Sequence, residues 1–363
     1  SPLTAQGTFT SSSETRDAAG TLLSSFSNSS ASGGFLGGGI LAGGLLQWLI
    51  QVPGVRAAGF SLAPSWDRGD GTVARTIRAF APALIGLAAV QINFAVDQIL
   101  VRALVDPSAN TYTHLANRLL QLPLALIGIS ASTGVAPLFA RLAAEGSFPA
   151  LTRALKRSCE MSLLVILAAG GGLFLLAEPV VTVLFQHGRF DAGNTAVLAP
   201  TLRAYLWGLP AAALAGLLIR ARQSRGDFRG PAWIAASVVP VNLALDWILL
   251  PRMGVPGAGY ATSASLILQA LFLGSGLRGL EIGGPLGIGR LPRLLAPGFL
   301  VVAAVLPLRS LLAEQAATVW GLALLVGAGI AVAAAGTAWL LPAEFQELRG
   351  ALRRRGRASS QGR

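Results

Sequence analysis

The sequence predicts an all-α membrane protein that crosses the bilayer several times. Of its 363 residues, 53% are hydrophobic and only 12% are charged, whereas soluble domains carry about 25% charged residues. The mean hydropathy is +0.62. Apolar segments long enough to cross roughly 30 Å of hydrocarbon recur from about residue 35 to residue 341. Together these observations predict a polytopic membrane protein.

Nine segments have the length and apolar character of a transmembrane helix. They cover residues 35–52, 80–104, 115–138, 160–184, 197–219, 231–250, 257–275, 294–312 and 318–341. Some are interrupted by proline, for example at Pro210 and Pro240. Neighbouring helices or a water-filled cavity must satisfy the backbone groups that such breaks free, and this arrangement is typical of transporters.

The net charge of +12 comes mainly from arginine, and its placement predicts the orientation of the chain. Loops on one side of the predicted helices, together with residues 342–363, hold 21 basic residues, whereas the opposite loops hold 4. Because cytoplasmic loops carry the excess of Lys and Arg, the C-terminus is predicted to be cytoplasmic. The charge is thereby explained without nucleic acid as a partner. One cysteine and two histidines exclude an internal disulfide, a Cys-type zinc site and a histidine metal cluster.

Two aspartates, Asp97 and Asp246, lie well inside predicted apolar helices. Asn242 precedes Asp246 by four residues, so their side chains share one helix face. Counted from the predicted outer helix ends, Asp97, Asp246 and Thr262 are seven, five and six residues deep, or roughly 7–11 Å. A carboxylate inside a membrane costs roughly 2.5–3.5 kcal/mol on insertion scales and usually marks an ion or substrate path. Oxygen ligands at one depth predict a site for a small hard cation such as Na⁺.

These polar residues also have structural interpretations. Asn242 and Thr262 can be interhelical hydrogen-bond partners, which are common in membrane bundles, and the two aspartates can have a purely structural role. Arg118 lies only a few residues from the predicted outer end of its helix. It either snorkels to the membrane interface or faces a cavity, where it meets an anion or a carboxylate.

Four motifs, in this order along the chain, resemble segments of the MurJ/MviN lipid II flippase family. They are HLANRLLQLP at residues 114–123, LFQHGRFD at 184–191 with Glu178-Pro179 before it, RQSRGDFRGP at 222–231, and GVPGAGYAT at 254–262. Several spaced motifs in one order are far more specific than any single motif. The resemblance covers about residues 35–341.

The resemblance implies a fold with two six-helix lobes related by pseudo-symmetry, followed by two further helices. Five helices of the first lobe, where the family places several substrate-binding arginines, have no counterpart among the 363 residues. We therefore expect either a piece of a longer protein or a chain in which residues 1–34 replace the lost helices. The implied organisation is a Ser/Gly-rich loop or disorder (1–34), a remnant helix of the first lobe (35–52), a basic cytoplasmic linker (53–79), the complete second lobe (80–275), two C-terminal transmembrane helices (294–341) and a basic cytoplasmic tail (342–363).

The resemblance also implies roles for particular residues. Some members bind Na⁺ through positions that correspond to Asp97, Asn242, Asp246, the carbonyl of Ala258, and Thr262. The family's arginine that faces the central cavity and is implicated in holding the lipid pyrophosphate corresponds to Arg118.

The implied function is a flippase for lipid II, the undecaprenyl-pyrophosphate-linked peptidoglycan precursor. It would work by alternating access in the bacterial inner membrane, moving the lipid from the inner to the outer leaflet. The expected partners are this precursor and membrane lipids; no catalytic residue is expected, and Na⁺ is the one candidate ion.

Three alternatives stay open. A related polysaccharide-lipid flippase or multidrug exporter is disfavoured by the motif at 184–191 and by the two additional helices. A membrane polyprenyl-phosphate transferase would need clustered carboxylates, often with Mg²⁺, on the cytoplasmic side, where Asp67, Asp70 and Asp227 are scattered. The third alternative is a nonfunctional fragment. The sequence predicts no oligomeric state.

Overall fold

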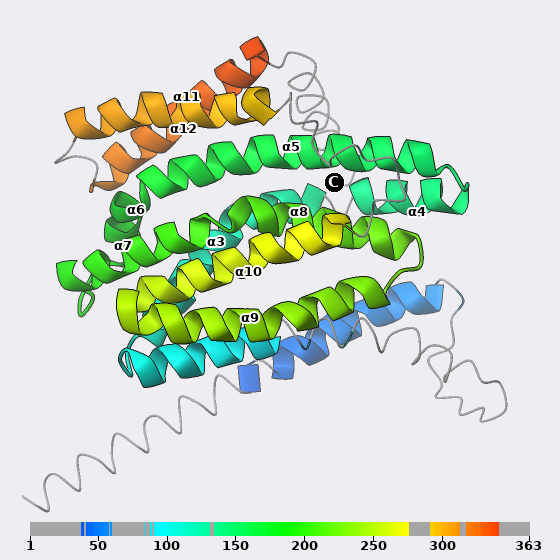
Figure 1. Cartoon of the computed structure of the whole chain (residues 1–363), viewed down its shortest axis with the longest axis horizontal. Helices are drawn as coiled ribbons and strands as arrows, with labels where there is room; N and C mark the ends of the chain where they lie inside the picture. The colour runs from blue at the N-terminus through cyan, green and yellow to red at the C-terminus, as the bar shows by residue number, and fades with distance from the viewer. Residues whose placement is uncertain are drawn as a thin grey trace, which may run out of the picture. The chain divides into compact units, whose positions relative to one another are not determined.

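The computed structural model describes residues 38–39, 41–57, 59, 84, 88, 91–130, 134–275, 291–312 and 317–340. Every regular element in these ranges is helical, which confirms the predicted all-α class. The helices are 41–57, 91–104, α3 (Asn110–Ser130), α4 (Ala136–Ala144), α5 (Phe148–Leu175), α6 (Ala177–Phe185), α7 (Ala192–Leu206), α8 (Leu209–Ser224), α9 (Arg229–Met253), α10 (Val255–Ser275), α11 (Leu291–Leu311) and α12 (Val319–Leu340) (Figure 1). The predicted segments 1–34 and 342–363 lie outside the described residues.

The chain divides into two units, residues 1–71 and 72–363. In the first unit, helix 41–57 carries exposed apolar side chains, among them Leu41 and Trp48. This helix lies where residues 35–52 were predicted to be helical, but it continues to residue 57. The predicted linker 53–79 therefore begins as helix, and its part beyond residue 59 lies outside the described residues.

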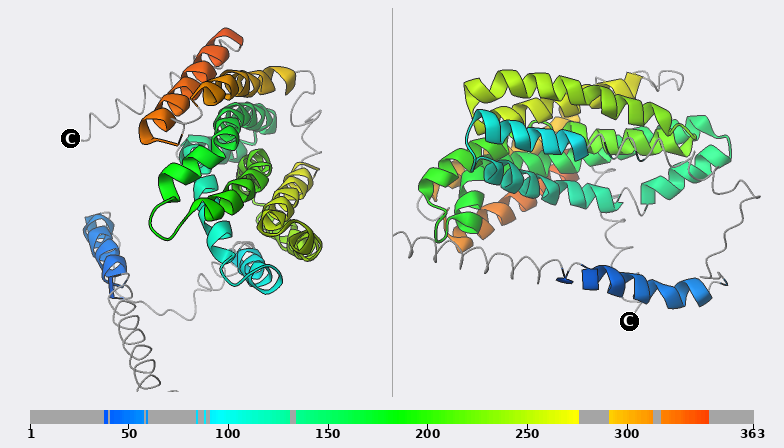
Figure 2. Two further views of the ribbon diagram at one scale, coloured as in Figure 1. Left: turned by 90° about the vertical axis from the view of Figure 1, so that its left-hand side faces the viewer. Right: turned by 90° about the horizontal axis from the view of Figure 1, so that it is seen from below.

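Helix α5 organises the packing of the second unit. It packs against α8, α11 and α12 and runs between the α11–α12 pair and the other helices in Figure 1. The main core cluster includes Ile166 of α5, Leu202 of α7, Leu209 of α8 and Val301 of α11. Helices 91–104, α9 and α10 lie on the opposite side of this core from α11 and α12 (Figure 2). The side chains of the predicted cation site come from these three helices, whereas Arg118 lies on α3.

The predicted span 160–184 is wrong in its bounds, because two helices share it. Helix α5 starts at Phe148 and ends at Leu175, and α6 follows from Ala177. Pro179 has no N–H, so it cannot donate to the carbonyl of Leu175 four residues earlier. The guanidinium of Arg309 on α11 donates to that carbonyl instead, with 2.7 Å between Nη1 and O. A distant arginine thus satisfies the backbone group that the chain break frees.

The predicted span 115–138 also differs from the structure. Its helix, α3, begins five residues earlier, at Asn110, and ends at Ser130. The short helix α4 follows from Ala136 to Ala144 and packs against α5 and α8. A proline in the first turn of α4, Pro137, favours a new helix start, because its missing N–H has no intrahelical partner there in any case.

Three described helices are long and apolar enough by themselves to cross a membrane: α5, α9 and α12. The pair α7 and α8 forms a fourth such segment, bent by 42° at Trp207 and Gly208. This bent pair occupies the predicted span 197–219, and α9 and α10 match the predicted spans 231–250 and 257–275 closely. The total of nine spans stays a prediction.

Candidate functional site

A buried cluster of polar side chains joins helix 91–104, α9 and α10. The amide nitrogen of Asn242 donates to Asp97 Oδ1 at 2.7 Å and to Asp246 Oδ2 at 3.0 Å. The hydroxyl of Thr262 donates to Asp97 Oδ2 at 3.4 Å. Asp97 is 4% exposed, and Asn242 and Asp246 are 0% exposed. The structure therefore brings together the four side chains that sequence depth and spacing had selected.

Apolar side chains seal this cluster at the end of the bundle where α9 and α10 join. Val101, Leu250 and Ala258 belong to one buried hydrophobic cluster. Each lies four residues, about one helical turn, from Asp97, Asp246 or Thr262 respectively. Apolar side chains thus lie between the carboxylates and that end of the bundle. An unpaired charge that is buried beside such side chains is costly in free energy.

The turn between α9 and α10 fixes the register of the two helices that carry the cluster. Gly254 ends α9 with a φ of 65°, a left-handed conformation that favours glycine. A side chain at Gly257 would place a Cβ 2.7 Å from the carbonyl oxygen of Leu249, so only glycine allows this approach. The tight turn sets Asp246 and Thr262 at the same depth on neighbouring helices.

The side chains of the cluster carry oxygen atoms of the kind that a hard cation prefers. Two buried acceptors of the cluster, Asn242 Oδ1 and Asp246 Oδ1, have no hydrogen-bond partner among the described residues. The –NH₂ group of Asn242 lies between the two carboxylates and bridges them. Rotation of the amide would exchange its nitrogen and oxygen, which are assigned from their hydrogen bonds. That rotation would turn all the facing groups into oxygen acceptors, the ligands that hard cations prefer.

Ala258, the fifth predicted ligand, lies one turn before Thr262 on α10 and is fully buried. Its position on α10 agrees with the prediction, and a role for its carbonyl stays a prediction. In the described ranges, no three His, Cys, Asp or Glu residues gather as a metal-binding group. The cluster offers two carboxylates, with an amide and a hydroxyl as its other side-chain oxygens.

Arg118 lies on α3, apart from the cluster, and its side chain is exposed. Among the described residues, it forms no ion pair or hydrogen bond that would hold its guanidinium. Beside it, Gln121 donates to the side-chain oxygen of Asn117 at 3.1 Å. His114, one turn away, is also exposed. This face of α3 therefore carries a stripe of exposed polar side chains.

Sequence reasoning missed two polar residues that adjoin the cluster. Tyr205 of α7 is buried, and its side chain lies against Thr262 and near Asp97 and Asp246. Ser263, the neighbour of Thr262, bonds to the backbone of the bend between α7 and α8. Tyrosine and serine occur widely in apolar helices, so neither residue stands out in the sequence; only the packing of α10 on α7 identifies them.

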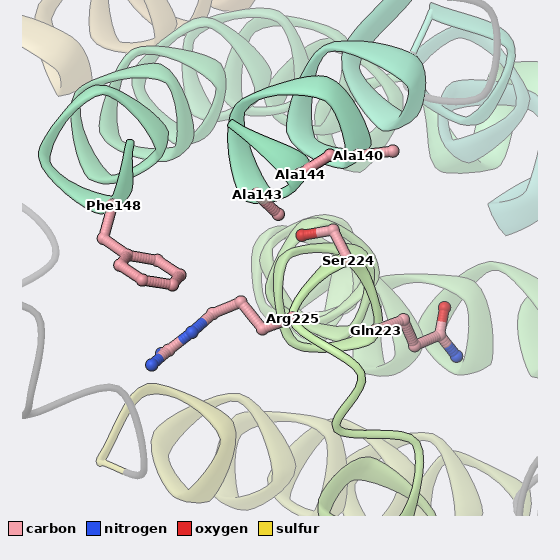
Figure 3. Close-up of a pocket in the computed structure, with 7 residues that line it drawn as sticks. All are labelled: Ala140, Ala143, Ala144, Phe148, Gln223, Ser224 and Arg225. Atoms are coloured by element: carbon pink, nitrogen blue, oxygen red, sulfur yellow. The ribbon is translucent and has the colours of Figure 1, made fainter. Parts of the chain in front are cut away.

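Two cavities lie at other places than the polar cluster. One, of about 480 Å³, lies between α4 and the C-terminal end of α8, where the guanidinium of Arg225 stacks over the ring of Phe148 at 5.2 Å (Figure 3). The other, of about 370 Å³, lies between α6 and α11 and contains the 2.9 Å ion pair of Arg309 and Glu178. Neither cavity is lined by a predicted site residue.

Comparison with known proteins agrees with this fold. Residues 18–339 match the family described as lipid II flippase MurJ. A probable lipid II flippase MurJ of Rhizobium meliloti is 31% identical over 266 residues, which are 72% of this chain and 49% of that protein. Its counterpart in Haemophilus influenzae is 30% identical over 239 residues, or 64% of this chain and 46% of that protein. The chain thus spans about half the length of the curated relatives it matches.

A solved structure described as lipid II flippase MurJ in an inward closed conformation has the same fold. The two chains are 21% identical, with a TM-score of 0.61, over 76% of this chain and 56% of that one. The expected family resemblance is thereby confirmed by a match along most of the sequence and by the arrangement of the helices. The chain belongs to the lipid II flippase MurJ family.

Proposed function

We propose that this chain forms the second lobe and the C-terminal helix pair of a flippase for lipid II. The observation that carries the proposal is the family match over residues 18–339, since the matched curated relatives are described as lipid II flippases. The flippase moves the lipid-linked precursor from the inner to the outer leaflet by alternating access. No covalent bond is made or broken, so the polar side chains bind and release rather than react.

We propose that the guanidinium of Arg118 binds the pyrophosphate of the lipid. Its guanidinium is exposed on α3 and unpaired within the described residues. A planar guanidinium can donate two parallel hydrogen bonds to phosphate oxygens. The neighbouring amides of Asn117 and Gln121 add neutral hydrogen-bonding groups to the same stripe. This combination suits a headgroup that carries both phosphate and sugar.

Asp97, Asn242, Asp246, Thr262 and the carbonyl of Ala258 are the residues that would hold Na⁺. When bound, Na⁺ would supply one positive charge to two buried carboxylates. Without it, the amide of Asn242 is the only described donor that contacts both carboxylates. The cluster joins three helices, so the state of its carboxylates bears directly on how tightly these helices pack.

The lipid tail is proposed to stay in the membrane beside α11 and α12. Both helices expose large apolar side chains, including Phe299 (69% exposed), Trp320 (85%) and Trp339 (80%). Tryptophan is enriched near membrane interfaces, where one part of its ring system is in lipid. If the polyprenyl chain stays on this surface, only the headgroup has to cross the membrane along the polar face of α3.

The proposed orientation places the C-terminus in the cytoplasm of a bacterium, with the protein in the inner membrane. It rests on the basic asymmetry of 21 residues against 4. A reporter fused after Arg357 should read cytoplasmic, and one inserted between Asp106 and Thr113 should read external. Equal signals at the two sites would contradict this topology.

Complementation tests the transport function itself. We would express residues 1–363, and separately a chimera in which the preceding helices of the Rhizobium meliloti relative are joined to residues 80–363, in cells depleted of their lipid II flippase. The chimera should restore growth, and residues 1–363 alone should not, because the resemblance places several substrate-binding arginines in the first lobe. A stably inserted chimera that fails to rescue would contradict the proposed function. Rescue by residues 1–363 alone would contradict the proposed location of those arginines.

A further inference from the structure

A hydroxyl group from α10 is inserted into the backbone of the bent α7–α8 pair. In a continuous α-helix, the N–H of Gly208 would donate to the carbonyl of Ala204. Here the Gly208 N–H donates to Ser263 Oγ at 2.9 Å as well as to the Tyr205 carbonyl at 3.1 Å, and Ser263 Oγ donates to the Ala204 carbonyl at 2.7 Å. Helices bend sharply where a side chain enters the hydrogen-bond ladder in this way. Ser263 therefore contributes to the 42° bend, together with Pro210 in the first turn of α8, which cannot donate to the carbonyl of Leu206.

Close packing leaves little freedom at this bend. A Cβ added at Gly208 would lie 2.7 Å from Ser263 Cα, so the approach of the two helices requires glycine. A Cβ added at Gly259 on α10 would lie 2.7 Å from the Cβ of Ala204 and 3.0 Å from the backbone nitrogen of Tyr205. Helix α10 is thus closely packed against the end of α7 at Gly259 and against the bend at Ser263.

The same short stretch of α10 carries the polar cluster. Ser263 follows Thr262 directly in the chain, and Thr262 donates to Asp97. The side chain of Tyr205, the third residue before Gly208, lies against Thr262 and near Asp97 and Asp246. The cluster is thus connected to the bend in two ways that meet at Thr262, one through the backbone of α10 to Ser263 and one through the side chain of Tyr205.

We propose that Ser263 and Tyr205 are positioning residues that couple the bend between α7 and α8 to occupation of the cation site. This inference rests on the proposed Na⁺ site. Movement of Thr262 toward or away from a ligand displaces Ser263 by the rigid backbone of α10, and it changes the support of the Tyr205 side chain. The bend then differs between the cation-free and cation-bound protein. A change of about 10° would move the far end of a 16-residue helix such as α8 by about 4 Å, at about 1.5 Å per residue.

Hydrogen exchange on the purified full chain tests this coupling, compared in Na⁺ and K⁺ at equal ionic strength. The probe segment is 203–212, which contains the bend, and segment 160–170 of α5 is the internal reference. Na⁺ at ten times its dissociation constant should slow exchange at the bend roughly tenfold relative to the reference, because the bend then opens from the cation-free protein alone. The melting temperature, measured in the same two salts, reports cation binding separately.

Ser263→Ala and Tyr205→Phe should both lose this slowing and keep the rise in melting temperature with Na⁺, because neither residue is a proposed ligand. Matched controls are Ser237→Ala, whose hydroxyl bonds only to its own helix at 2.9 Å, and Tyr260→Phe, an exposed tyrosine on α10. Both controls should behave as wild type. If Ser263→Ala does not fold, Tyr205→Phe decides by itself.

The outcomes separate the coupling from the cation site. A wild-type protein that is stabilised by Na⁺ without slower exchange at the bend would overturn the coupling and leave the cation site standing. Slowing that persists in the folded variants would overturn the assignment to Ser263 and Tyr205. Absence of any Na⁺ effect on melting would overturn the cation site and this inference with it.

Discussion

The buried cluster and Arg118 are both polar features of apolar helices, but the two regions differ in how their polar groups are satisfied. In the cluster, Asp97, Asn242 and Asp246 are at most 4% exposed and bond to one another. Arg118 is exposed on α3. The side chains of the cluster all come from residues 72–363, whereas Arg118 forms no hydrogen bond or ion pair with the described residues of this unit.

This difference indicates two kinds of site. A site formed by helices of one lobe can be assembled by the packing of that lobe, so its ligand should affect stability. A group that faces a cavity contacts its ligand only during transport, so its removal should affect function and leave stability nearly unchanged. The variants below test this division, in order of their expected effect on the free energy of unfolding.

Asp246→Asn should have the largest effect on cation-dependent stability. A ligand that binds only the folded state stabilises it by about 2.7 kcal/mol at one hundred times its dissociation constant. Na⁺ should therefore raise the melting temperature of the wild-type chain relative to K⁺, and Asp246→Asn should erase that difference. Asp97→Asn should do the same. Thermal melts in the two salts at equal ionic strength measure the effect.

The matched control for these variants is Asp106→Asn. Asp106 is exposed in the turn before α3, where hydrogen bonds from the hydroxyl and the backbone N–H of Ser108 lower the pKa of its carboxyl. The contribution of Asp106 is fully present above its ordinary pKa and is lost as the pH falls through the lowered value. Because Asp106 is not a proposed ligand, the melting temperature of the control should respond to Na⁺ as fully as that of the wild type at neutral pH. Identical melts of wild type and Asp246→Asn in both salts would reduce the cluster to interhelical hydrogen bonding.

Asn242→Leu should destabilise the protein even without Na⁺. Its amide is the donor to both carboxylates, and a buried acceptor that loses its partner costs about 1–3 kcal/mol. The variant should melt below wild type in K⁺ and show no response to Na⁺. Asn117→Leu, on the open stripe of α3, should change the free energy of unfolding by less than about 0.5 kcal/mol. Equal destabilisation by both leucine variants would contradict the division into a closed and an open site.

Thr262→Val should have a smaller effect, because it replaces a hydroxyl with a methyl group of similar shape. The lost hydrogen bond to Asp97 is long, at 3.4 Å, so we expect a loss of about 1 kcal/mol or less. The Na⁺-dependent rise in melting temperature should become smaller without disappearing. Thr152→Val is the control, since that hydroxyl bonds only to the Phe148 carbonyl of its own helix. A full Na⁺ response in Thr262→Val would remove this residue from the site.

The sequence predicted the cluster better than it predicted the helix ends. Asp97, Asn242, Asp246 and Thr262 were recognisable because polar side chains inside apolar segments are costly, and because helical spacing fixes both face and depth. Packing then brought these side chains together as expected. That reasoning did not determine whether the cluster binds a cation, because the Asn242 amide donates hydrogen bonds to both carboxylates and so provides an alternative partner for them.

The sequence could not locate features that depend on contacts between distant segments. Hydropathy is continuous across Leu176, so the change from α5 to α6 was missed; it is supported by Arg309, which lies more than a hundred residues later. Pro210 predicted an interruption, and the bend lies directly before it. The sequence could not show that Ser263 of another helix bonds to the backbone at this bend. In the sequence, each of these long-range hydrogen bonds is visible only as one serine or one arginine. Serines and arginines that make no such bond look the same.

Arg118→Ala should have the smallest effect on stability and a large effect on transport. The side chain is exposed, so its truncation should change the free energy of unfolding by less than about 0.5 kcal/mol and leave the Na⁺ response intact. In the chimera used for complementation, the same change should abolish rescue. Arg118→Lys should also fail, since a lysine ammonium cannot reproduce bidentate contact with phosphate. The control is Arg102→Ala, an exposed arginine near the end of helix 91–104, which should keep both stability and rescue. Normal rescue by Arg118→Ala would show that this arginine snorkels to the interface, and the open stripe of α3 would lose its proposed role.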